Sequence, residues 1–155
     1  MDPSIPGYLM QQTGMTAAEV DAVMNKKSGL EGVSGVSSDN RDVTAAAAAG
    51  NKRAQLAQDM LGYQIRKYVG SYAAAMGGLD CIVFTGGIGE NDCGVRATVC
   101  KDMEFMGVAI DEEQNKVRGL EINDISAEGS RVKVLVVCTN EELMIARDTK
   151  AIVEG

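Results

Sequence analysis

The amino-acid sequence predicts an α/β fold, in which helices flank a central sheet. Two short apolar runs, at residues 81–84 and 132–137, have the length and composition of buried strands, and each leads through a polar turn into a helical pattern. A long amphipathic pattern over residues 51–76 precedes the first run. Helix, strand, loop and helix in repeated order are typical of α/β proteins, which bind ligands at the carboxyl ends of their strands. At 155 residues the chain is long enough for one hydrophobic core and short for two full domains.

The N-terminal segment is expected to begin with short helical turns, because two prolines fall within its first six residues. Thr16, with Glu19 three residues later, forms a capping-box pattern, which predicts a helix over residues 17–26. Residues 26–42, KKSGLEGVSGVSSDNRD, are rich in glycine and serine and are expected to form a loop. A loop of this length in a compact domain favours a functional role.

The clearest helix is predicted over residues 51–76. Its apolar side chains recur every three or four positions, which gives the helix one apolar face. The members of this face are Ala57, Leu61, Ile65, Tyr68, Tyr72 and Met76. Gly77 and Gly78 are expected to end the helix.

Each predicted strand is followed by a helix. Residues 81–84 (CIVF) lead into the glycine-rich segment TGGIGEN and then into a helix over about residues 92–102. The run at 132–137 (VKVLVV) is less uniformly apolar because of Lys133, and it leads through CTN into a helix over about residues 141–153. We expect the apolar side chains Leu143, Met144 and Ile152 of that last helix to be exposed and to favour self-association.

Charge and composition exclude several classes of function. The net charge of −7, without a basic stripe, argues against nucleic-acid binding. No apolar run approaches the roughly 20 residues that span a bilayer, and no basic-then-apolar leader opens the chain, so we expect no membrane association and a cytoplasmic location. The absence of histidine removes the commonest general base. Because the four cysteines form no CxxC pair, we expect buried thiols in a reducing compartment and no zinc site.

The segment GGIGEN, at 86–91, is the first candidate site. Glycines after a strand let the backbone approach a ligand, and the next helix offers its N-terminus to an anion. The segment matches neither the P-loop nor the dinucleotide fingerprint, and Glu90 is a poor neighbour for a terminal phosphate. Its carboxylate suits a ribose hydroxyl or an adenine amino group better. The alternative is a tight strand-to-helix turn in which Asn91 caps the next helix.

Two further stretches are candidates with simple structural alternatives. In SSDNRD, at 37–42, an arginine between two acids has the chemistry to hold a base or a phosphate, and the alternative is an Asx-turn before a helix. In TNEE, at 139–142, either carboxylate has the chemistry to hold Mg²⁺. The alternative there is a helix start enriched in acids, which the helix dipole favours.

Taken together, four motifs closely resemble the acetate kinase family. They are NKKSG, GVSGVSSDNRD, DCIVFTGGIGEN and TNEELMIARDT, and they occur in the family's order over essentially the whole chain. That family belongs to the superfamily of acetate and sugar kinases, heat-shock proteins and actin. The resemblance implies part of an actin-like ATPase domain, of the ribonuclease H-like kind, with a central sheet flanked by helices. Propionate and butyrate kinases share much of the pattern.

The resemblance also implies roles for particular residues. It places Asp39, Asn40 and Arg41 in the adenosine pocket, although a larger residue is often seen at the position of Asn40. It places Gly87, Ile88, Gly89, Glu90 and Asn91 in the loop over the adenosine and the inner phosphate. It assigns Glu141 to the magnesium ion, with Glu142 as the alternative register. The implied cofactors are ATP or ADP and Mg²⁺.

The implied reaction transfers the γ-phosphoryl group of ATP to acetate and gives acetyl phosphate and ADP, reversibly. By the same resemblance, residues 1–155 match the C-terminal, nucleotide-binding part of such an enzyme, and we expect the N-terminal domain and all catalytic residues to be absent. The chain alone is then expected to be inactive and to pair as a homodimer. The alternatives are a fragment of a propionate or butyrate kinase, a non-catalytic nucleotide-binding module, and a structural subunit that completes a partner chain.

Overall fold

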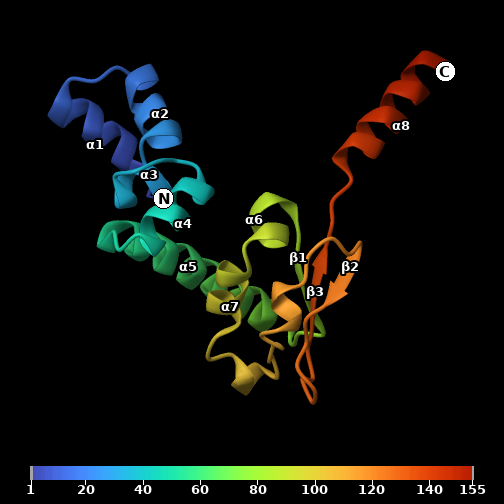
Figure 1. The fold of residues 1–155 in the computed structure, drawn as a ribbon. Helices are drawn as coiled ribbons and strands as arrows, with labels where there is room; N and C mark the ends of the chain where they lie inside the picture. The colour runs from blue at the N-terminus through green and yellow to red at the C-terminus, as the bar shows by residue number, and fades with distance from the viewer. Residues whose placement is uncertain (1, 155) are drawn as a thin grey trace. The chain divides into compact units, whose positions relative to one another are not determined.

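The computed structural model describes residues 2–154, which divide between Gln64 and Ile65 into two compact units (Figure 1). Helices and a small three-stranded sheet are both present, so the predicted α/β class is confirmed. Helix α5, Lys52–Met76, begins in the first unit and ends in the second, and its bounds match the prediction. Within the described part of the chain, no helix has both the length and the apolar character needed to cross a membrane.

The first unit is helical. It contains α1 (Ser4–Thr13), α2 (Ala17–Lys26), α3 (Gly29–Ser34), α4 (Asn40–Ala48) and the first half of α5. The capping box of α2 is confirmed, because Thr16 Oγ1 accepts from the Glu19 backbone N–H at 3.3 Å and Glu19 Oε2 accepts from the Thr16 N–H at 2.8 Å. Val43, Ala54 and Ala57 form the buried core of this unit, and Leu30 and Val33 of α3 pack against it.

The prediction of a loop over residues 26–42 is wrong for much of its length. Helix α3 occupies its centre, and α4 begins at Asn40, with Asp39 as its N-cap. The side chain of Arg53, from α5, donates to the backbone carbonyls of Val33 at 2.8 Å and of Gly32 at 3.0 Å. These bonds satisfy carbonyls at the C-terminal end of α3, which a six-residue helix cannot satisfy alone. The helix therefore depends on a contact 20 residues away that composition does not show.

The second unit contains a sheet in the order β1-β3-β2 (Figure 1). Strand β1 (Cys81–Phe84) and strand β3 (Lys133–Val137) are parallel, with Cys81 opposite Lys133 and Phe84 opposite Val136. Strand β2 (Ile122–Asp124) is antiparallel to β3 and was not predicted. Because β1 and β3 are parallel and in register, the segments that follow them leave the sheet at the same edge.

The strands β1 and β3 alternate between buried and more exposed side chains. Ile82, Phe84, Val134 and Val136 are buried, whereas Val83 between them is 53% exposed. The expectation that residues 81–84 form a buried strand is therefore wrong at Val83. Side chains alternate between the faces of a strand, so Val83 lies on the opposite face from Ile82 and Phe84.

The remaining helices of the second unit are α6 (Gly86–Asn91), α7 (Cys93–Cys100), two short 3₁₀ turns (Glu104–Met106 and Gln114–Lys116) and α8 (Glu141–Glu154). The helices predicted over 92–102 and 141–153 are confirmed as α7 and α8. Asp102, at a φ of 58°, follows the end of α7 in the left-handed region. Helix α8 has no buried residue, and the predicted exposure of Leu143, Met144 and Ile152 is confirmed.

The four thiols are free and differ in environment. Cys100 is buried, and burial raises its pKa to about 11. Cys138 is exposed, which corrects the expectation that all four are buried, since it follows β3 in the segment that leaves the sheet. Partial burial, followed by the negative charge of Glu90, raises the pKa of Cys138 as well.

Limited alkylation is therefore expected to modify Cys138 first and Cys100 last. The reactive species is the thiolate and the reagent needs access, so we expect Cys138 to react at least about tenfold faster than Cys100 at pH 8. Peptide mass spectrometry after timed quenching measures both rates, and the denatured chain provides the control in which all four thiols react together. Equal rates in the native chain would contradict the burial of Cys100.

Candidate functional site

The candidate site begins where β1 ends. Gly86 adopts a φ of +71°, a conformation that residues with a Cβ rarely adopt. A Cβ on Gly89 would lie 3.2 Å from the carbonyl carbon of Phe84, so Gly89 allows this segment to pack directly against the end of β1. The glycines therefore form a compact turn after the strand.

GGIGEN was expected to be a loop, and it forms the short helix α6 instead. The Asn91 side chain donates to the Gly87 carbonyl at 2.9 Å and closes the helix on itself. The alternative in which Asn91 caps the next helix is also wrong. Asp92 is the N-cap of α7, and its carboxylate accepts from the Val95 N–H at 3.0 Å.

A buried arginine holds α6 from its C-terminal end. Arg96, on α7, is 1% exposed, and its guanidinium donates to the carbonyls of Gly89 at 2.7 Å and of Glu90 at 3.0 Å. Its other nitrogens donate to the side-chain and backbone oxygens of Asn115. Burial lowers the pKa of the Arg96 guanidinium below its ordinary value. Arg118 adds a bond to the Asn91 carbonyl at 2.8 Å.

Glu90 connects the two segments that leave the sheet. Its Oε1 atom accepts from the Gly86 N–H at 2.9 Å, and from the Thr139 N–H and the Thr139 hydroxyl, each at 2.8 Å. These bonds, with the Thr139 N–H as the largest cause, lower the pKa of Glu90 below its ordinary value. The carboxylate is therefore ionised at neutral pH and engaged within the protein through one oxygen. A contact of its other oxygen with a ribose or an adenine stays a prediction.

A polar hollow opens between these segments. It has a volume of about 340 Å³ and is lined by Gly87, Glu90, Thr139, Asn140, Glu141 and Glu142. Asn140 Oδ1 accepts from the Leu143 N–H at 3.0 Å, so Asn140 caps the start of α8 and the two following carboxylates lie in the first turn. The predicted residues Gly87, Glu90 and Glu141 are thus brought together.

The hollow is compatible with a magnesium ion that arrives with a nucleotide. No cluster of three or more histidine, cysteine or acidic side chains that could hold a metal exists among residues 2–154. Mg²⁺ commonly binds one or two carboxylates and completes its shell with phosphate oxygens and water. Glu141 and Glu142 supply such carboxylates at the rim of the hollow. These carboxylates therefore fit a Mg²⁺ ion that is coordinated by the protein and by phosphate oxygens together.

Asp39, Asn40 and Arg41 lie in the first unit, at the start of α4. Arg41 Nη2 forms an ion pair with Asp39 Oδ2 at 2.6 Å, and the Arg41 side chain lowers the pKa of Asp39 to about 2. Asn40 Oδ1 accepts from the Gln58 side chain at 2.8 Å. The guanidinium remains 89% exposed and is held in a fixed pose. That these three residues share one adenosine pocket with Gly87–Asn91 stays a prediction.

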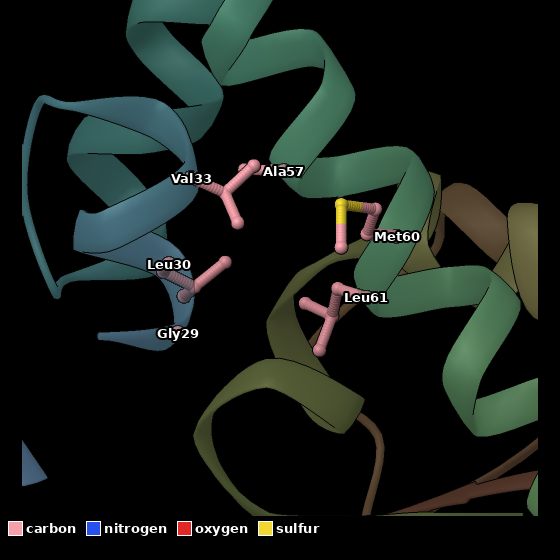
Figure 2. A pocket seen from close by; sticks show the side chains of 6 residues that line it. All are labelled: Gly29, Leu30, Val33, Ala57, Met60 and Leu61. Atoms are coloured by element: carbon pink, nitrogen blue, oxygen red, sulfur yellow. The ribbon is translucent and has the colours of Figure 1, made fainter. Parts of the chain in front are cut away.

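A separate apolar hollow lies within the first unit (Figure 2). Figure 2 shows the side chains of Leu30 and Val33 from α3 facing the same space as those of Met60 and Leu61 from α5. Its volume is about 280 Å³, and Gly29 and Ala57 complete its lining. Ala57 and Leu61, which belong to the predicted apolar face of α5, are among its lining residues, and the lining includes no polar side chain.

The sequence interpretation missed Arg96 and Asn115, and it included Thr139 only as part of TNEE, without a role of its own. The available signal for Arg96 was one charge in the otherwise uncharged stretch CGVRATVC, which indicates a buried and fully paired arginine. Asn115 and Thr139 carry no comparable signal. Their roles arise from contacts between segments 19 and 49 residues apart.

The parallel strands β1 and β3, with a polar hollow at their carboxyl ends, have the arrangement at which α/β proteins commonly bind ligands. The sequence model of the acetokinase family matches residues 1–147 and identifies the family within this class of α/β proteins. The chain belongs to the acetokinase family.

Individual relatives agree with this assignment. The acetate kinase of Moorella thermoacetica is 53% identical over 155 residues, which are 100% of this chain and 39% of that protein. The crystal structure of Porphyromonas gingivalis acetate kinase superimposes with a TM-score of 0.88 at 52% identity, over 99% of this chain and 38% of that one. A propionate kinase from Francisella tularensis gives a TM-score of 0.83 at 37% identity, over 94% of this chain and 37% of that one. The fold is therefore that of part of an acetate kinase, an actin-like ATPase fold, and the chain spans under two fifths of these relatives' length.

Proposed function

We propose that this chain is the nucleotide- and magnesium-binding part of an acetate kinase-type enzyme, which transfers the γ-phosphoryl group of ATP to a short-chain carboxylate. One observation carries the proposal. In a member of the acetokinase family, the glycine turn after β1 and the acidic start of α8 line a single polar hollow at the carboxyl edge of a parallel strand pair.

The proposed roles follow the chemistry of each side chain. Residues Gly87–Asn91 of α6 approach the ribose and the inner phosphate, because their glycines leave room for a ligand against the backbone. Asp39, Asn40 and Arg41 contact the adenosine, with the Arg41 guanidinium held by Asp39 as a flat surface for a base. Glu141 holds Mg²⁺ together with the phosphates.

The absence of histidine agrees with this reaction. A carboxylate nucleophile is already ionised at neutral pH and needs no general base. Catalysis then consists of in-line positioning and neutralisation of phosphate charge. Bound Mg²⁺ supplies part of that neutralisation, and the residues of this chain hold and orient the nucleotide. No residue of the chain is proposed to act on the carboxylate.

Acetate is the proposed acid, because relatives that match over the whole of this chain, from Moorella thermoacetica and Heliobacterium modesticaldum, are acetate kinases. Propionate is the second candidate, since a propionate kinase shares the structure with a TM-score of 0.83.

The purified 155-residue chain is expected to form no acetyl phosphate from ATP and acetate. Our proposal assigns it the nucleotide side alone, so the rate should stay at the uncatalysed level. Trapping acyl phosphate as the hydroxamate, with acetate, propionate and butyrate in parallel, measures this directly. Turnover by the chain alone would overturn the division of roles.

A mixing experiment distinguishes two hypotheses, that the chain is part of an enzyme and that it is a non-catalytic nucleotide-binding module. The chain is combined with a separately purified fragment that covers the part of the Moorella thermoacetica enzyme that this chain does not match. Activity that appears only in the mixture supports the proposal. Nucleotide binding without activity in any mixture favours the non-catalytic module.

We also propose that the chain pairs with a second copy through the exposed side of α5. Tyr68 is 54% exposed, Tyr72 62% and Met76 66%, and the two tyrosine rings stack with centroids 6.3 Å apart. Large exposed aromatic groups of this kind mark association surfaces. Tyr72→Glu is expected to halve the mass measured by sedimentation equilibrium at micromolar concentration. Tyr72→Phe, which keeps the ring, should leave the mass at the dimer value, and a native monomer would contradict the proposal.

A further inference from the structure

Glu90 sits in a motif that was expected to contact the ligand, yet one of its oxygens is used inside the protein. Glu90 Oε1 accepts three hydrogen bonds, one from the Gly86 N–H and two from Thr139, a residue 49 positions further along the chain. We call this set, formed by Gly86, Glu90 and Thr139, the Glu90 bridge.

The bridge is anchored from the protein interior. The Glu90 carbonyl accepts from the buried Arg96 guanidinium at 3.0 Å, so the backbone of Glu90 is fixed to α7. Its side chain then reaches outward to Thr139. A continuous path therefore runs from a buried charge on α7, through Glu90, to the segment that carries Glu141.

The segment after β3 depends strongly on this contact. Cys138 is held by its N–H, which donates to the Glu121 carbonyl at 3.0 Å. Thr139, the next residue, is held by Glu90 through both its N–H and its hydroxyl. Glu141 then begins α8, which has no buried residue. The hydrogen bonds of the Glu90 bridge therefore determine where Glu141 lies relative to α6, because no residue of α8 is buried against the rest of the unit.

We propose that Glu90 is a positioning residue, which fixes the Glu141 segment against the glycine turn and thereby couples metal binding to nucleotide binding. This inference rests on the proposed function. The proposed role also explains why a glutamate occurs in a segment that is proposed to bind a nucleotide. The charge of Glu90 is directed to N–H and O–H donors of the protein, so the oxygen that accepts their hydrogen bonds does not face a phosphate. Hydrogen bonds to an ionised acceptor are shorter and stronger than neutral ones, which suits a bridge between two otherwise separate segments.

The test compares ADP binding with and without Mg²⁺ by calorimetry on the full 155-residue chain. Glu90→Gln removes the charge, Thr139→Val removes the hydroxyl donor, and Thr139→Ser keeps it. Glu128→Gln and Thr149→Val make the same chemical changes at exposed positions outside the hollow. Thermal melts of every variant establish that each is folded.

The native chain is expected to bind ADP more tightly with Mg²⁺ than without it. In Glu90→Gln and Thr139→Val, the dissociation constant for Mg-ADP should rise about tenfold while that for metal-free ADP stays near native. Thr139→Ser and both controls should keep the native ratio of the two constants. A general loss of structure would weaken both forms of binding, so the ratio separates positioning from stability. A native ratio in Glu90→Gln would overturn the proposal.

Amide hydrogen exchange tests the bridge without nucleotide. The Gly86 and Thr139 amides should exchange slowly in the native chain and fast in Glu90→Gln. If the native chain bound neither ADP nor Mg-ADP, the proposed function would fail for this chain, and the exchange data would decide on the bridge separately. Slow exchange that is lost in Glu90→Gln supports the bridge, and fast exchange in the native chain overturns it.

Discussion

Replacement of Arg96 by methionine is expected to lower the free energy of unfolding by about 3–5 kcal/mol, the largest effect of any single change considered. The Arg96 side chain is 1% exposed and donates to Gly89, Glu90 and Asn115. Methionine fills much of the same volume but leaves these buried oxygens without donors. Because domains are stable by only about 5–15 kcal/mol, such a loss removes most of the stability of a domain at the lower end of that range.

Urea unfolding followed by circular dichroism measures this change. Arg118→Met is the matched control, because Arg118 donates to the neighbouring Asn91 carbonyl from an exposed position. We expect the control to cost about 1 kcal/mol or less. Arg96→Lys keeps the charge without the planar fork and should fall between the two. A cost below about 1 kcal/mol for Arg96→Met would show that the guanidinium does not hold α6.

Replacement of Glu141 by glutamine is expected to remove the advantage that Mg²⁺ gives to ADP binding. The carboxylate at the start of α8 is the proposed protein ligand of the metal, and a neutral amide oxygen is a much weaker partner for Mg²⁺. The dissociation constant for Mg-ADP should rise by about tenfold to a hundredfold, towards the value for metal-free ADP. Metal-free ADP binding should change little.

The variant Glu142→Gln determines whether Glu141 or Glu142 binds the metal. Both carboxylates line the hollow, and both make the same favourable interaction with the N-terminus of α8, so their stability effects should match. Calorimetry on both variants, with and without Mg²⁺, separates the two. Loss of the Mg²⁺ effect in Glu142→Gln and not in Glu141→Gln would move the metal by one residue. If neither variant lost the effect of Mg²⁺, the start of α8 would not be part of the metal site.

Periodicity and capping patterns predicted the elements whose stability is local or strongly amphipathic. Helices α2 and α5 and strand β1 were found within one residue of their observed bounds, because a capping box, a long apolar repeat and a compact apolar run are each visible in a short window. Strand β2, with three residues, is defined by its pairing with β3 and has no such pattern.

The short helices α3 and α6 were missed for a different reason. Both are rich in glycine, which lowers helix propensity, and each is held at its C-terminal carbonyls by an arginine from another helix. Arg53 serves α3 and Arg96 serves α6. Tertiary hydrogen bonds of this kind override local propensity and cannot be derived from composition.

The candidate site was predictable as a set of segments but not as a set of contacts. The motif residues Gly87, Glu90 and Glu141 were identified, and the structure brings them to one hollow. The internal role of Glu90 was not identified, because its partner Thr139 depends on the parallel pairing of β1 with β3. The sequence alone does not distinguish a glutamate that binds a ligand from one whose carboxylate accepts hydrogen bonds from the protein itself.

The claim that this chain carries the nucleotide site is tested most directly by titration with Mg-ADP in a calorimeter. The native chain is compared with the Arg41→Ala, Asn91→Ala double variant, and with a control that carries Asn25→Ala and Arg147→Ala at exposed positions outside the hollow. We predict binding by the native chain and the control, and loss of binding in the first double variant. A folded native chain that does not bind Mg-ADP would contradict the proposal and leave this chain as a scaffold.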